Sequence, residues 1–280
     1  MARMWLIRAA VLGAVALLLA ASSPAGQSRA DALHRSFDEI LEVNVRDGFV
    51  YYNALKQTRG ALDRYVTSLD VAPAAFAAWS RDERLAFWLN AYNAFVLQTV
   101  VDRYPIRGRA KEYPPDSIRQ IYGAFDKRTF RAAGRAVTLD EIEKKILPEF
   151  KDPRAYFALS AAAVGSGRLR SEAYRGADLG QQLAAMTAEF LTTQEHVELD
   201  RGQNELAISA IIGWHEQEFV AALGGGDPRF ETRSAVERAA IALLAPHLYR
   251  SERQFLERNE FRVRYKEFNW RLNDLTGGRR

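Results

Sequence analysis

Residues 80–105 have the sequence SRDERLAFWLNAYNAFVLQTVVDRYP and predict the longest helix of the chain. Ser80 is an N-cap residue with Glu83 three positions later, a capping box that satisfies the free amides of a first helical turn. Pro105 ends the helix, because proline has no amide hydrogen to donate. Apolar side chains recur between these limits at helical spacing, which predicts a buried helix against which the rest of the chain packs. The stripe comprises Leu85, Trp88, Leu89, Tyr92, Phe95, Val96, Thr99 and Val100.

Shorter elements are predicted on both sides of this helix from apolar spacing, helix caps and turn residues. Helices are predicted over 31–44, 61–69, 138–147, 178–191 and much of the region up to Leu256. Strands are predicted over 49–52 after the Asp47-Gly48 turn, over 130–132 and 135–137 around Gly134, and over 197–199 and 205–208 around Arg201-Gly202. Residues 155–164 are a buried strand or a helix start, which periodicity does not separate. An extended segment is predicted from Val263 to Trp270.

The order of these elements indicates the fold class. Helices outnumber strands, and the strands come as hairpins rather than in alternating strand–helix–strand units. We therefore predict an α+β fold, a helix-rich single domain with a small antiparallel sheet built from hairpins. No linker rich in Pro, Gly or Ser interrupts residues 26–280, so they are assigned to this one globular domain.

The first residues have the pattern of a cleavable export signal. Arg3 and Arg8 precede an apolar run that is too short to span a bilayer, and small residues follow it at Ser23 and Ala25. We predict a signal peptide over 1–25 and a periplasmic or secreted mature protein with no stable membrane span. An uncleaved anchor is the alternative, although it would place Arg8 within the hydrocarbon layer.

Composition excludes several kinds of chemistry. The chain of 280 residues contains no cysteine, so disulfides, a thiolate nucleophile and cysteine metal ligands are all ruled out. Its formal net charge of +4 falls to +2 without the signal segment, which holds two arginines and no acid. This small charge and the lack of a recognition motif argue against a nucleic-acid partner.

Histidines and basic residues also give little support to a metal or cofactor. The four histidines are His34, His196, His215 and His247, and no two have the spacing that places metal ligands on one helical face. We predict neither a metal nor a cofactor, and assign His215 to the start of a surface helix. The basic clusters at 103–111, 127–135 and 168–175 indicate a solvated face, or an anionic ligand held by Arg168 and Arg170.

Four separated motifs resemble one protein family. They are Phe87-Trp88-Leu89-Asn90-Ala91-Tyr92-Asn93-Ala94, Leu139-Asp140-Glu141-Ile142-Glu143, Phe157-Ala158-Leu159 with the following 165–170 turn, and 211–219 around Trp214. In this order they resemble the domain of unknown function 547 family, and the resemblance extends over about 33–275, including the closing segment from Tyr265 to Asn273. The resemblance implies a fold that agrees with the prediction above and no settled reaction.

The chain departs from that family's pattern where reactive side chains would stand. The resemblance implies an Asn-Cys pair at Ser160-Ala161, a second Cys at Ser166, a His at Tyr156 and a Glu-His pair at Glu143-Lys144. A thiolate needs a basic neighbour to form at neutral pH, so relatives with those residues could use a Cys/His/Glu site. This chain cannot use a thiol, and whether it is an enzyme stays open, with a non-catalytic protein favoured.

We carry two hypotheses for the function. The first is a non-catalytic binding or scaffolding protein that holds a small molecule or protein partner in a groove near Trp88, Asn90, Asn93, Arg170 and Trp214. The paired amides of Asn90 and Asn93 fit this role, or alternatively a structural network that ties loops to the helix.

The second hypothesis is a hydrolase or transferase in which Glu143 acts as general acid or base and Ser160 or Ser166 positions the substrate. An enzyme of this kind would place Glu143, a serine and a histidine within hydrogen-bond reach in a concave surface. The combined candidate residues are Trp88, Asn90, Tyr92, Asn93, Glu143, Ser160, Ser166, Arg170, Trp214 and His215.

Overall fold

Helix α6 (Arg81–Arg103) runs through the hydrophobic core, as its sequence predicts. Ser80 and Glu83 close the capping box, and every side chain from Leu85 to Leu97 is buried. The structure is a computed structural model that describes residues 28–225 and 227–276. The predicted signal peptide therefore lies outside the described residues.

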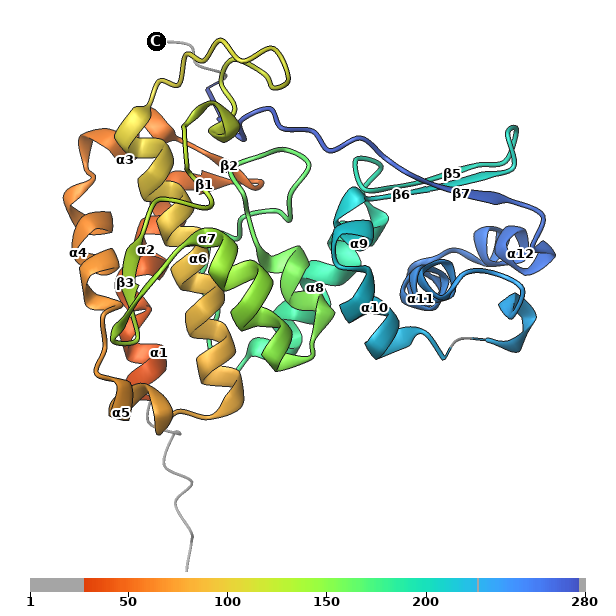
Figure 1. Ribbon diagram of the computed structural model, residues 1–280, viewed down its shortest axis with the longest axis horizontal. Coiled ribbons are helices and arrows are strands. Elements are labelled where there is room, and N and C mark those ends of the chain that lie inside the picture. The colour runs from red at the N-terminus through yellow and green to blue at the C-terminus, as the bar shows by residue number, and fades with distance from the viewer. Residues whose placement is uncertain (1–27, 226, 277–280) are drawn as a thin grey trace, which may run out of the picture.

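The helices that precede α6 lie beside it along its length (Figure 1). They are α1 (Arg29–Leu33), α2 (Arg35–Asn44), α3 (Tyr52–Gln57), α4 (Gly60–Ser68) and α5 (Pro73–Ala77). The Asp47-Gly48 turn joins β1 (Val45–Arg46) to β2 (Phe49–Val50), and both turn residues have a positive φ, of 52° and 78°. The predicted strand over 49–52 is shorter than expected, since Tyr52 already begins α3.

The segment between α6 and α8 supplies mostly short elements. They are η1 (Ile118–Gln120), β3 (Phe130–Ala132), β4 (Arg135–Val137), α7 (Leu139–Glu141), η2 (Ile142–Ile146), η3 (Leu147–Phe150) and η4 (Pro153–Ala158), followed by α8 (Leu179–Thr192). The predicted hairpin around Gly134 and the cap at Thr138 are confirmed. The apolar run over 155–164 is neither a long strand nor an α-helix: it completes η4 and then continues as buried irregular chain.

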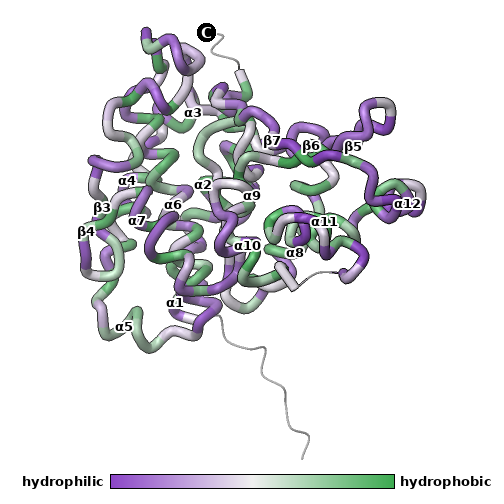
Figure 2. Tube along the Cα trace, turned by 45° about the vertical axis from the view of Figure 1, so that its right-hand side comes forward, coloured by the Kyte–Doolittle hydropathy of each residue, from purple (hydrophilic) through white to green (hydrophobic). Residues whose placement is uncertain are grey.

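The last part of the chain forms a second group of elements, drawn at the right of Figure 1. They are β5 (Val197–Asp200), β6 (Glu205–Ile208), α9 (Ala210–Trp214), α10 (Glu216–Leu223), η5 (Pro228–Phe230), α11 (Ala235–Leu244), η6 (Ala245–His247), α12 (Arg250–Arg258) and β7 (Arg262–Tyr265). The predicted hairpin of β5 and β6 is confirmed, but β7 joins β6 in parallel, so this sheet is not purely antiparallel. Hydrophilic residues gather along α12 and at the tip of the hairpin (Figure 2).

After β7 the chain returns across the molecule to the N-terminal helices (Figure 1). Val50 bridges to Asp274, and Ala163 bridges to Leu272. The Tyr52 hydroxyl donates to Asn273 Oδ1 at 2.8 Å, and the Tyr104 hydroxyl donates to Asp274 Oδ2 at 2.7 Å. This fixed return path, residues 266–276, is called the C-terminal segment below.

The helix-rich α+β fold class is thus confirmed, with hydrophobic side chains from both groups of elements joined in one core. None of the helices within residues 28–225 and 227–276 is both long and apolar enough to cross a bilayer.

Candidate functional site

A cleft of about 860 Å³ lies where the two groups of elements meet. Its walls come from α6, η2 and η4 on one side and from α9 and α10 on the other, and the C-terminal segment contributes Phe268 and Trp270. The volume is in the range that holds a small organic ligand. Residues far apart in sequence therefore face one space.

A carboxylate–imidazole pair lies in this cleft. Glu143, in the single π-helical turn η2, accepts from the Tyr92 hydroxyl through Oε2 at 3.2 Å, and its Oε1 lies 3.1 Å from His215 Nε2. An ionised carboxylate only accepts hydrogen bonds, so Nε2 carries the hydrogen. Nδ1 makes no hydrogen bond within the described part of the chain, and it is the ring atom left to accept from a ligand.

Two tyrosines enclose that pair. The Tyr156 ring stacks on His215 with centroids 3.5 Å apart and planes 9° from parallel. Burial, the nearby charges of Glu218 and Glu143, and a weak hydrogen bond to Glu218 all raise the pKa of the Tyr156 hydroxyl. Burial and the charge of Glu143 likewise raise the pKa of the Tyr92 hydroxyl far above its ordinary value. Both phenols are therefore neutral at physiological pH, and the hydroxyl hydrogen of Tyr92 is already used in the bond to Glu143.

Aromatic rings form the opposite wall. The Trp214 side chain is half exposed, at 52%, and its ring centroid lies 4.8 Å from Phe268 and 6.1 Å from Trp270. The Arg119 guanidinium sits over the Trp270 ring at 4.2 Å and over the Phe125 ring at 4.5 Å. An indole left open to solvent within a cleft is a ready surface for a ligand to stack on.

Half of the predicted candidate residues meet here. Tyr92, Glu143, Ser166, Trp214 and His215 all line the cleft. The assignment of His215 to a helix start is confirmed, because it is the N-cap of α10, but its surface position is wrong: the side chain is buried against Tyr156 and Glu143. Ser166 lines the cleft as predicted. Its hydroxyl hydrogen is already used, because Oγ donates to Ala163 O at 2.6 Å.

The two amides on α6 lie elsewhere and tie loops to the core. Asn90 donates to Tyr174 O at 2.8 Å and accepts from Tyr174 N at 2.9 Å. Asn93 donates to Ala158 O at 3.0 Å and accepts from Ser160 N at 2.8 Å. Each amide thus supplies the hydrogen-bond partners that the backbone of a buried loop would otherwise lack. Both asparagines therefore have the structural role that was the alternative to ligand binding.

The groove predicted near Trp88, Asn90, Asn93, Arg170 and Trp214 is not formed, because of these five only Trp214 lines the cleft. Trp88 is buried against Phe76 and Phe87, and Ser160 is buried outside the cleft. The prediction treated all polar residues of the motifs as facing one space, whereas α6 presents them in different directions.

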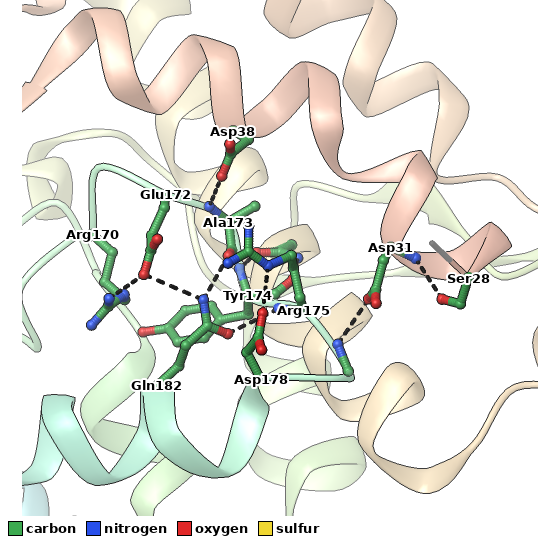
Figure 3. Close-up of polar contacts among 12 residues, drawn as sticks. Ser28, Asp31, Asp38, Arg170, Glu172, Ala173, Tyr174, Arg175, Asp178 and Gln182 are labelled. Atoms are coloured by element: carbon green, nitrogen blue, oxygen red, sulfur yellow. Dashed lines mark hydrogen bonds and ion pairs between the residues drawn. The ribbon is translucent and has the colours of Figure 1, made fainter. Parts of the chain in front are cut away.

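Arg170 belongs to a network that fixes the loop before α8 (Figure 3). Its guanidinium pairs with Glu172, which also accepts from Gln182 at 3.4 Å. The neighbouring Arg168 pairs with Asp47 at 2.6 Å and with Glu189. Because carboxylates already neutralise both arginines, an anion held between them has no support in the geometry.

Several cleft residues were not among the predicted candidates. They are Arg119, Phe125, Asp140, Lys144, Tyr156, Phe268 and Trp270 among others. Four positions where the chain departs from the family pattern line the cleft. They are Lys144, Tyr156, Ala161 and Ser166. The departures from the family pattern were therefore a signal in the sequence for Lys144, Tyr156 and Ala161 that the candidate list did not use.

Among residues 28–225 and 227–276, no group of three His, Asp or Glu side chains has an arrangement that could hold a metal ion. The pair of Glu143 and His215 on its own supplies too few ligands for a closed site.

The fold and the cleft define a helix-rich α+β protein with an aromatic and acidic ligand-sized cleft between its two groups of elements. Residues 76–191 match the family model described as "Protein of unknown function, DUF547", which supports the resemblance of the chain to the domain of unknown function 547 family. The match covers the motifs on α6, α7 and η4 but not the one around Trp214. No curated protein matches the chain. No solved structure matches it either.

Proposed function

We propose that this protein binds a small organic ligand in the cleft and does so without forming a covalent bond to it. The observation that carries the proposal is the Tyr156 hydroxyl: it is buried, it borders the cleft, and it has no hydrogen-bond partner of ordinary geometry within the described residues. The neighbouring Glu218 carboxylate takes the hydroxyl hydrogen in a weak hydrogen bond, so the phenolic oxygen is left to accept from a ligand in the cleft.

The half-exposed Trp214 supports the same function. Its indole offers a stacking surface opposite the polar groups of Glu143 and Tyr156, so one ligand could satisfy both walls. A protein partner inserting a side chain into the cleft would use the same groups.

Ligand-induced thermal shift of residues 26–280 against a metabolite panel tests the proposal, since a ligand that binds only the native state raises the melting temperature. We expect at least one compound to raise it in the wild type and in Ser160→Ala and Ser166→Ala, because neither serine hydroxyl is needed. A shift that survives in Trp214→Ala, or a panel without any shift, would reject the cleft as the binding site.

A second candidate function, acid–base catalysis, is favoured by the contact of Glu143 with His215. Glu143 would orient the ring while Nδ1 took a proton from water and returned it to a leaving group. This hypothesis gave a role to Ser160 or Ser166, but Ser160 does not line the cleft and the Ser166 hydroxyl donates to Ala163 O.

Hydrolysis of chromogenic esters by the wild type, Glu143→Gln and Ser166→Ala separates this candidate from simple binding. Catalysis requires turnover that falls by roughly a hundredfold or more in Glu143→Gln and persists in Ser166→Ala. Equal rates in the wild type and Glu143→Gln would reject it.

We also propose that the mature protein acts in the periplasm or outside the cell. The support is the charged, apolar and small-residue pattern of residues 1–25. Mass spectrometry of the protein recovered after expression in a bacterium tests it: an N-terminus at Gly26 is expected, and an intact Met1 in the cytoplasmic fraction would contradict it.

A further inference from the structure

The cleft has a charge opposite to that of the whole chain. Four of its lining residues are acids, Asp140, Glu143, Glu216 and Glu218, and two are bases, Arg119 and Lys144, although the chain carries a net charge of +4. A local excess of carboxylates in a basic protein must come from the arrangement of the fold rather than from composition.

The two bases do not cancel this excess. Lys144 Nζ lies 2.8 Å from Asp140 Oδ2, so those two charges neutralise each other. Within the described ranges, no basic side chain forms an ion pair with Glu216 or Glu218. Three carboxylates, those of Glu143, Glu216 and Glu218, therefore remain against the single guanidinium of Arg119.

Arg119 shows that the aromatic wall itself stabilises positive charge. Its guanidinium lies over the rings of Trp270 and Phe125, at 4.2 and 4.5 Å, because the negative face of an aromatic ring attracts a cation. Trp214 belongs to the same cluster of rings and is half exposed. It offers a second cation-binding face, next to the first turn of α10 with Glu216 and Glu218.

The hydrogen-bonding groups around Trp214 are mainly acceptors. Besides the carboxylates of Glu143 and Glu218, the phenolic oxygen of Tyr156 is buried and without a partner of ordinary geometry among the described residues. In the neutral His215 ring, whose hydrogen on Nε2 faces Glu143, Nδ1 is an acceptor as well. A ligand that brings N–H donors and positive charge complements this set.

We propose that the cleft selects an organic cation, an ammonium or guanidinium group on a small apolar body. This inference rests on the proposed binding function and names its ligand class. A neutral sugar also stacks on an indole, but it leaves the excess of negative charge uncompensated. An anion would meet three carboxylates and only one guanidinium, that of Arg119, which already lies against the aromatic rings.

The test uses calorimetric titration with choline, putrescine and agmatine, and with dimethylbutanol, the neutral carbon analogue of choline. At least one of the three cations should bind, choline should bind more tightly than dimethylbutanol, and the affinity should fall as salt is added. Glu218→Gln should weaken cation binding roughly tenfold, which corresponds to about 1.4 kcal/mol.

Glu260→Gln is the matched control, because Glu260 is an exposed carboxylate outside the cleft, and its removal should leave the affinity unchanged. Equal binding of choline and dimethylbutanol, or equal effects of the two glutamine substitutions, overturns the inference. If only neutral or anionic compounds bind, and their binding is lost in Trp214→Ala, the inference of a cationic ligand fails while the proposed function stands. If compounds of every charge fail to bind, the proposed function falls with it.

Discussion

Asn93 and Glu143 illustrate two uses of a buried polar side chain in this protein. Asn93 has both of its amide atoms bonded to backbone groups, so it is fully occupied by the fold. Among the residues that the structure describes, Glu143 is bonded only to side chains of the cleft, Tyr92 and His215. From sequence alone both were candidates, because neither the residue type nor its motif says what will lie opposite.

Replacing Asn93 with alanine should destabilise the protein strongly. The change leaves Ala158 O and Ser160 N buried without their partner, and we expect a loss of about 2–4 kcal/mol in the free energy of unfolding. Urea denaturation measures it. Asn53→Ala on α3 is the control, since Asn53 is exposed, and it should cost far less. Similar losses in the two variants would show that the Asn93 amide is not a structural bridge.

Two buried histidines should make stability depend on pH. Burial lowers the pKa of His34 to about 3 and that of His196 to about 4, from the ordinary value of 6.5. Below pH 6.5 the unfolded chain binds protons at these rings while the folded chain does not. Stability must therefore fall as the pH drops from 6.5 towards 4, by up to about 1.4 kcal/mol per pH unit for each ring.

The measurement is the free energy of unfolding in urea from neutral pH to about pH 5, where these rings titrate only in the unfolded chain. His196→Gln should reduce the slope of stability against pH, and His247→Gln, at a half-exposed position, serves as the control for histidine number. A slope that is the same in the wild type and in His196→Gln would contradict the assignment.

Elements with strong local signals were predicted well. The capping boxes of α6 and α7 and the hairpins around Gly134 and Arg201-Gly202 follow from residues that lie next to each other in sequence. The parallel pairing of β7 with β6 was missed because strand partners far apart in sequence leave no local pattern. The π-helical turn that carries Glu143 was missed because a single turn with i→i+5 hydrogen bonds is too short to change the apolar spacing from which a helix was predicted.

The turn between η4 and α8 depends on Gly167. A Cβ at this position would lie 1.7 Å from Phe157 O, a backbone atom that cannot move aside without shifting η4. We expect Gly167→Ala to lower the free energy of unfolding by about 3 kcal/mol, because the new methyl group would clash with the backbone.

Gly180→Ala is the matched control for that substitution. Gly180 lies in the first turn of α8, and a Cβ there would meet nothing within 4 Å. Alanine is the better helix former, so this variant should be stabilised by up to about 1 kcal/mol. Thermal melts of both variants give the comparison, and a harmless Gly167→Ala would mean that the turn has room to relax.

On the scale of the whole molecule, the cleft exists because the chain passes the same place several times. Tyr92 comes from α6, Glu143 from η2, Tyr156 from η4, and His215 from the junction of α9 and α10. The C-terminal segment then closes the wall with Trp270. Sequence reasoning found half of its candidates there but could not assemble them, since this convergence depends on tertiary packing over the full length of the domain.

The measurement that tests the central claim most directly is calorimetric titration of the tightest compound from the thermal-shift panel into the wild type and Trp214→Ala. If the cleft is the binding site, the half-exposed indole is part of it, and its loss should weaken binding at least tenfold, or about 1.4 kcal/mol, without lowering the melting temperature of the unliganded protein appreciably. Unchanged affinity in Trp214→Ala would place the ligand elsewhere and contradict the account.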